Sequence, residues 1–132
     1  MTALLVILLI VHALSALFWA GTTLTLARMG AAGAGLLQFA RPQAGAAAVT
    51  ILAGIGLWGV AHRGPPSGGE WVLSIGALCA LAAAGLQHGM AWRAARRAPA
   101  DPGAGAAFAR GQRLAAVLLS LAMIAMVTFR YA

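Results

Sequence analysis

The chain has 132 residues, of which 62% are hydrophobic and 8% are charged, with 9 basic and 2 acidic side chains. Soluble domains average about 45–50% apolar and about 25% charged residues. So few polar side chains cannot cover the surface of a water-soluble globule, which excludes a soluble enzyme domain. The basic residues are all arginines at the ends of apolar runs. This placement is typical of membrane-helix flanks, so no nucleic-acid partner is expected.

In chain order, the first 27 residues carry no charge, which exceeds the roughly 20 residues that a helix needs to span a bilayer. Pro42 suits the start of a second helix, because its missing N–H would be unpaired there. Residues 62–69 (HRGPPSGG) form a predicted turn. Glu70 favours the start of a third helix, where its carboxylate meets the positive end of the helix dipole. A fourth apolar run follows the polar segment 93–105.

The sequence therefore predicts an all-α integral membrane protein with a single domain over residues 1–132. The predicted architecture is a four-helix up-down bundle, with helices over residues about 2–28, 42–62, 70–93 and 106–130. The lipid bilayer is its expected environment.

The arginines predict the orientation of this bundle. The connections between helices one and two and between helices three and four lie on one side; they contain Arg28, Arg41, Arg93, Arg96, Arg97, Arg110 and Arg113. The opposite side has only Arg63 and Arg130. Because cytoplasmic loops carry the excess of arginine, both termini are predicted on the outer, periplasmic side of a bacterial inner membrane.

Two histidines, His12 and His88, are the candidate ligand residues inside the membrane. His12 begins a face that continues through Ser15, Trp19 and Thr23 at helical spacing. A polar face on an apolar helix is expected to point into the bundle. Neutral imidazole is a good ligand for haem iron, copper or zinc. The alternative is a histidine that is hydrogen-bonded to a neighbouring helix.

His88 lies within the segment Gly85–Gly89, whose spacing permits close approach of another helix or of a flat macrocycle. At 1.5 Å per residue, His12 is predicted about 15 Å and His88 about 26 Å below the outer surface. This offset leaves open a shared site, two separate sites and a site with one histidine. Three tryptophans near helix ends are predicted as interfacial anchors: Trp58, Trp71 and Trp92.

The segment His12-Ala-Leu-Ser-Ala-Leu-Phe-Trp19-Ala-Gly21 resembles the first helix of the membrane family that includes copper-resistance protein D and the HemJ-type protoporphyrinogen oxidases. Residues 42–58 resemble the family's second helix, and His88 falls where HemJ-type proteins carry a histidine. The family's lysine early in the third helix has no counterpart, because the chain contains no lysine. The resemblance implies handling of haem b or copper.

The leading hypothesis is a small membrane protein that binds haem b, with His12 as the first ligand candidate and His88 as the second. Its role would be electron transfer or porphyrin oxidation at the quinone level; the sequence does not decide whether it is an enzyme. An alternative is a cofactor-free accessory subunit of a larger respiratory or photosynthetic complex, packed against other membrane subunits or a second copy. A further alternative is copper transport or binding through His12 and methionine ligands: Met90, Met123 and Met126.

Overall fold

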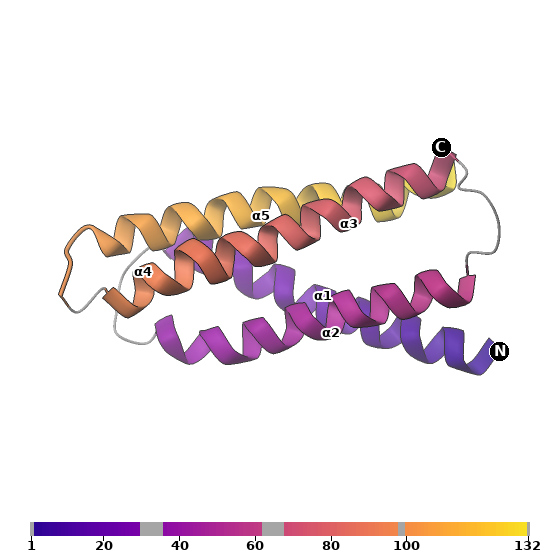
Figure 1. Ribbon diagram of the computed structural model, residues 1–132, viewed down its shortest axis with the longest axis horizontal. Coiled ribbons are helices and arrows are strands. Elements are labelled where there is room, and N and C mark those ends of the chain that lie inside the picture. The colour runs from indigo at the N-terminus through magenta and orange to yellow at the C-terminus, as the bar shows by residue number, and fades with distance from the viewer. Residues whose placement is uncertain (1, 30–35, 62–67, 98–99, 132) are drawn as a thin grey trace.

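The computed structural model describes residues 2–29, 36–61, 68–97 and 100–131, and the elements it contains are all helical (Figure 1). Their order is α1 (Thr2–Met29), the 3₁₀ turn η1 (Leu36–Phe39), α2 (Ala40–Ala61), α3 (Gly68–Leu86), the π-helix η2 (Gln87–Ala91), α4 (Trp92–Arg97), α5 (Ala104–Thr128) and the 3₁₀ turn η3 (Phe129–Tyr131). α3, η2 and α4 follow one another without a break.

Four of these helical stretches are long and apolar enough to cross a membrane: Ala3–Met29, Ala40–Ala61, Gly68–Arg97 and Ala104–Thr128. For the part of the chain that the structure describes, the prediction of an all-helical protein with four membrane-length helices is confirmed. The third stretch ends at Arg97 instead of residue 93. Alanine and arginine are strong helix formers, so the segment Trp92–Arg97 continues the helix instead of forming a connector.

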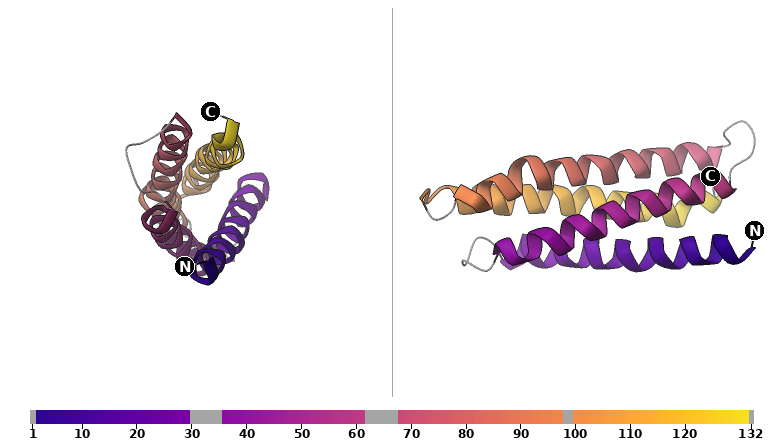
Figure 2. Two further views of the ribbon diagram at one scale, coloured as in Figure 1. Left: turned by 90° about the vertical axis from the view of Figure 1, so that its right-hand side faces the viewer. Right: turned by 60° about the horizontal axis from the view of Figure 1, so that its bottom comes forward.

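The four long helices form two close pairs. α1 packs along α2, α3 packs along α5, and α1 also contacts α5, whereas α2 and α3 meet over only a few residues. The two pairs are close at the end that holds η1 and α4, and they separate toward the end where α1 begins and α5 finishes (Figures 1 and 2). The first of these ends, here called the arginine-rich end, carries Arg28, Arg41, Arg93, Arg96, Arg97, Arg110 and Arg113.

The two buried core clusters lie in the half of the bundle next to the arginine-rich end, whereas in the other half α3 and α5 bury small residues such as Gly76 and Ala125 between themselves. Residues 3–18 of α1 include no buried side chain, and burial begins at Trp19. Likewise, α2 has no buried residue after Ala53. One core cluster joins all four long helices; its buried members are Trp19, Ala20, Ala47, Ala83, Ala115 and Leu119. In the opposite half, the inward faces of the two pairs are therefore not covered by the described chain.

Glycines allow α3 and α5 to pack closely. A Cβ atom on Gly76 would lie 2.9 Å from the Cβ of Ala125, and one on Gly111 would lie 3.1 Å from the Cβ of Ala91. By contrast, no side-chain or neighbouring backbone atom lies within 4 Å of a Cβ built on Gly85 or Gly89. The spacing of these two glycines predicted a close approach of another helix. No described helix approaches them, because both glycines are exposed.

Replacing Gly76 with leucine is expected to destabilise the α3–α5 pair by about 1–3 kcal/mol, since overpacking a close contact forces the helices apart. The measurement is unfolding of the purified protein in mixed micelles, followed by far-UV circular dichroism. Gly85→Leu is the matched control on the same helix, where a side chain has open space. Equal stability of the two variants would contradict this account of the packing.

Candidate functional site

The polar face of α1 points toward α2 and the bundle interior, as predicted. The Nδ1 atom of His12 lies 2.8 Å from the carbonyl oxygen of Thr50. A carbonyl oxygen only accepts hydrogen bonds, so Nδ1 carries the proton and donates it. The Nε2 atom of His12 then has a free lone pair, and it makes no hydrogen bond to any described residue.

A glycine on α2 makes room for this imidazole. A Cβ atom on Gly54 would lie 3.1 Å from Cε1 and 3.4 Å from Nδ1 of His12, so the ring lies against the α2 backbone. The His12 side chain is half-buried. Metal-binding histidines almost always donate their other ring N–H to a carbonyl or carboxylate, which fixes the tautomer and the ring orientation. His12 has this arrangement, with Nε2 as the available ligand atom.

One turn further along α1, hydroxyl groups join the two helices. The Oγ1 atom of Thr50 lies 2.9 Å from the Oγ atom of Ser15. Thr50 therefore contacts α1 twice, through its carbonyl oxygen and through its side chain. These contacts fix the rotation of α1 relative to α2 at the level of His12.

Deeper in the bundle, three glutamine side chains meet in a group that we call the glutamine cluster: Gln43, Gln87 and Gln112 together with Trp19 and Thr23. All five side chains are at most 1% exposed. None of the three glutamines was identified as a site residue from the sequence. The available signal was that three of the chain's four glutamines fall inside apolar helices.

The hydrogen bonds of the glutamine cluster connect α1, α2, η2 and α5. The indole Nε1 of Trp19 donates to Oε1 of Gln87 at 2.7 Å. The Nε2 atoms of Gln87 and Gln43 donate to Oγ1 of Thr23 at 2.8 and 2.9 Å. Gln87 also donates to Gln112 at 3.1 Å, and Gln112 donates to Gln43 at 3.4 Å. The bonds form a closed ring without a titratable group, so its direct role is to position helices.

Two backbone features bring Gln87 into this ring. The N–H of Trp92 bonds to the carbonyl oxygen of Gln87, five residues earlier, which is the π-helical pattern. Single π turns within α-helices are frequent at functional sites. In addition, Gly111 lets α5 approach the backbone of Ala91, which brings Gln112 within reach of Gln87.

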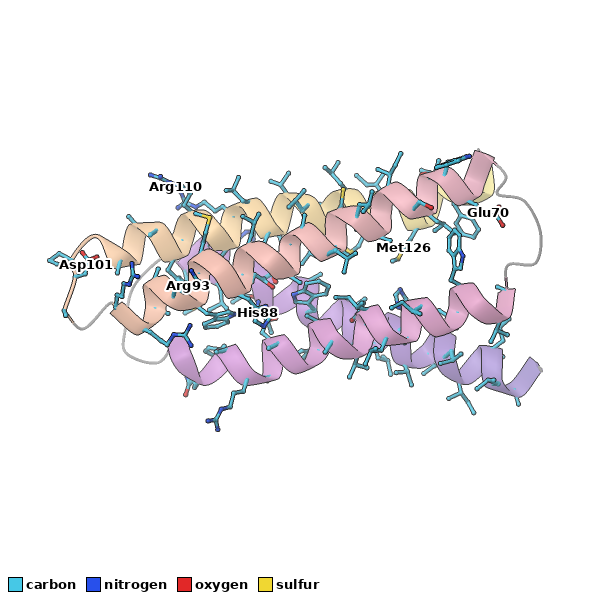
Figure 3. All side chains as sticks on the ribbon, in the orientation of Figure 1. Glu70, His88, Arg93, Asp101, Arg110 and Met126 are labelled. Carbon is cyan, nitrogen blue, oxygen red and sulfur yellow. The ribbon has the colours of Figure 1, made fainter. Side chains whose placement is uncertain are left out.

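His88, the second predicted ligand, is exposed on the same π-helix, and in the view of Figure 3 it lies on the side of η2 that faces α2. Its Nδ1 lies 2.9 Å from the carbonyl oxygen of Ala84 in its own helix. The bond between Trp19 and Gln87 sets the relative depth of the two histidines. His12 is seven residues before Trp19, so it lies about 10 Å further from the arginine-rich end than His88. The structure does not bring the two histidines together.

The three tryptophans predicted as interfacial anchors differ in their environments. Trp58 and Trp71 are exposed. The prediction for Trp92 is wrong: its side chain is 5% exposed and contacts Phe108 edge-on, with ring centroids 5.7 Å apart. The reason is that the helix continues past Trp92 to Arg97. The Nε1 atom of Trp92 is buried without a hydrogen-bond partner among the described residues.

No group of three or more histidine, cysteine, aspartate or glutamate side chains that could hold a metal ion occurs among the described residues. His62, which begins the predicted turn at residues 62–69, lies outside the described residues. Comparisons of the chain with models of known protein families, with curated proteins and with solved structures found no match. The resemblance to the family of copper-resistance protein D and the HemJ-type oxidases therefore stays a prediction.

Proposed function

We propose that the chain is a multi-pass protein of the bacterial inner membrane that binds haem b through His12 and serves electron transfer or porphyrin oxidation. The observation that carries the proposal is the anchored imidazole of His12. Its Nδ1–H is donated to the carbonyl oxygen of Thr50, and its Nε2 has no partner among the described residues.

These residues fit the requirements of a haem ligand. A proximal histidine holds haem iron through one ring nitrogen, and a hydrogen bond from the other nitrogen increases the basicity of the ligand. Gly54 leaves room for the ring against α2, and α1 has no buried side chain between residue 3 and Trp19, in the part that contains His12. A bound haem would supply one-electron exchange between donors and acceptors at the level of the quinone pool.

The other polar residues hold the ligand in place. The contacts of Thr50 with Ser15 and His12 fix the rotation of α1 against α2. The glutamine cluster fixes the depth of α1 against η2 and α5. His88 lies about 10 Å deeper, and its ring is exposed and bonded to its own helix. We therefore assign His12 as the histidine of this site and give His88 no part in it.

The direct test is the visible spectrum of the full chain, extracted with a mild detergent in the absence of metal chelators. We expect a Soret band and a reduced-minus-oxidised difference spectrum typical of haem b, at a stoichiometry near one haem per chain. Extraction without any Soret band, from cells that make haem, would overturn the proposal.

A specific observation favours a second candidate, the accessory subunit. Residues 3–18 of α1 bury no side chain, and the exposed side chains in this segment include Leu4, Leu9, Leu14 and Leu17. A larger membrane complex would cover these faces as readily as lipid does. Co-extraction of the chain with other membrane subunits would support this candidate, as would degradation of the chain when it is produced without them. No observation favours copper in the same way.

The proposed orientation is an up-down bundle with the arginine-rich end in the cytoplasm and both termini on the outer side, because arginine accumulates in cytoplasmic loops. Alkaline phosphatase, which is active only outside the cytoplasm, is expected to be active when fused after Ala132. The control fusion, within the α4–α5 connection at Asp101, is expected to be inactive. The reverse pattern would overturn the orientation and leave the four helices unaffected.

A further inference from the structure

A second candidate binding site lies at the arginine-rich end, apart from His12 and the glutamine cluster. A hollow of about 290 Å³ opens between the segment η2–α4 and the start of α5. Its lining includes Gly89 and Met90 from η2, Arg93 and Arg97 from α4, and Asp101 just before α5. Figure 3 shows Arg93 and Asp101 on this part of the chain.

The two arginines give the hollow a positive charge. Arg93 and Arg97 are four residues apart and therefore lie on the same face of α4. Both are exposed, and neither makes a hydrogen bond or ion pair with another described residue. Asp101 is the opposing charge, and one of its carboxylate oxygens accepts the N–H of Gly103 at 2.8 Å. The lining thus carries two positive charges and one negative charge.

The opposite part of the hollow is apolar. Gly89 has no neighbouring atom within 4 Å of a Cβ position, and the side chain of Met90 is 41% exposed. These residues precede Arg93 by one helical turn, which places them about 5 Å deeper in the membrane. The hollow therefore changes from basic to apolar along the membrane normal, over the distance that separates a lipid phosphate from the upper part of its acyl chains.

We propose that this hollow binds an anionic phospholipid, with Arg93 and Arg97 on the phosphate and the glycerol and acyl groups against Gly89 and Met90. Guanidinium groups match phosphate oxygens in geometry and charge. Basic pockets between membrane helices on the cytoplasmic side are typical lipid-headgroup sites. The proposal depends on the orientation given above and is independent of haem. Free phosphate shares the chemistry of the headgroup, so the test separates the two sources.

The test is native mass spectrometry of the full chain in neutral detergent, titrated with phosphatidylglycerol or with phosphatidylcholine of the same acyl chains. We expect the wild-type chain to retain phosphatidylglycerol preferentially. The double variant Arg93→Gln/Arg97→Gln is expected to bind it about 30-fold more weakly, because each arginine at a membrane surface contributes about fivefold. Equal retention of the two lipids by the wild-type chain would overturn the proposal.

The matched control is Arg96→Gln/Arg110→Gln, which removes two charges from the same end without altering the hollow. In Figure 3, Arg110 projects from the far edge of α5. This control is expected to bind phosphatidylglycerol as the wild-type chain does. An equal loss in both double variants would show a general attraction of charges and would overturn the proposal. Displacement of the lipid by an equal concentration of inorganic phosphate would also overturn it, in favour of a site for free phosphate.

A third variant tests the apolar part without changing charge. Gly89→Leu fits the open space at that position and fills the hollow next to Arg93. We expect weaker binding of phosphatidylglycerol with unchanged far-UV circular dichroism. Binding equal to that of the wild-type chain would place the lipid elsewhere and contradict the proposal. His12→Ala is expected to bind the lipid normally, which distinguishes failure of this site from failure of the haem proposal.

Discussion

Replacing His12 with alanine is expected to abolish the haem spectrum while leaving a folded chain in the membrane. The iron loses its ligand, whereas the fold loses one hydrogen bond to Thr50, with a net contribution of about 1 kcal/mol. The carbonyl oxygen of Thr50 lies within α2 and keeps its place in the helix. The measurements are haem per chain from the reduced-minus-oxidised spectrum and helix content from circular dichroism.

His88→Ala is the matched control, because it removes the same type of side chain from an exposed position. The Nδ1 of His88 bonds only within its own helix, to Ala84. We expect unchanged haem content in this variant. Equal haem in the wild-type chain and in His12→Ala would refute the ligand assignment. If that result came with loss of assembly into a larger complex, it would favour the accessory subunit, with His12 as an interhelical hydrogen-bonding group.

A second variant changes the position of His12 and keeps the histidine. A Cβ at residue 54 would lie 3.1 Å from the imidazole, so Gly54→Val is expected to displace the ring and to lower haem content. Gly59→Val on the same helix is the control, since no atom lies within 4 Å of a Cβ there. A normal haem content in Gly54→Val would show that the position of the ring against α2 is not required.

Apolar length was sufficient to predict the four helices, because a bilayer-spanning helix needs a minimum number of uncharged residues whatever its partners are. Helical spacing was sufficient to group His12 with Trp19 on one face of α1, and the structure places this face against α2 and Gln87. Both predictions depend on local properties of the chain. They required no knowledge of which helices are neighbours.

The partners of these residues could not be predicted in the same way. α2 is apolar around most of its circumference, so its pattern does not indicate that Gln43 points inward. The π turn that begins at Gln87 inserts an extra residue into the helical register, and no spacing rule applied to the sequence includes it. Trp92 was placed at the membrane surface because the helix was predicted to end next to it. Contacts between helices decide all three positions.

Replacing Gln87 with alanine is expected to cause a larger loss of stability than the same substitution at Gln43 or Gln112. Gln87 accepts a hydrogen bond from Trp19 and donates to Thr23 and to Gln112. Its removal leaves the indole N–H of Trp19 and the amide oxygen of Gln112 unpaired in a region that is at most 1% exposed. Unpaired buried groups cost about 1–3 kcal/mol each, although hydrogen bonds between membrane helices average nearer 0.6 kcal/mol.

From these values we expect a loss of about 2–5 kcal/mol in the free energy of unfolding, measured by titration with sodium dodecyl sulfate and read by far-UV circular dichroism. Gln38→Ala is the matched control, because Gln38 is an exposed glutamine. Gln87→Met separates the two causes of the loss, since methionine keeps most of the volume and removes the hydrogen bonds. If Gln87→Met is as stable as the wild-type chain, the ring of amides makes no net contribution to stability. If it is as unstable as Gln87→Ala, the hydrogen bonds hold α1 at its depth in the bundle, and with it His12.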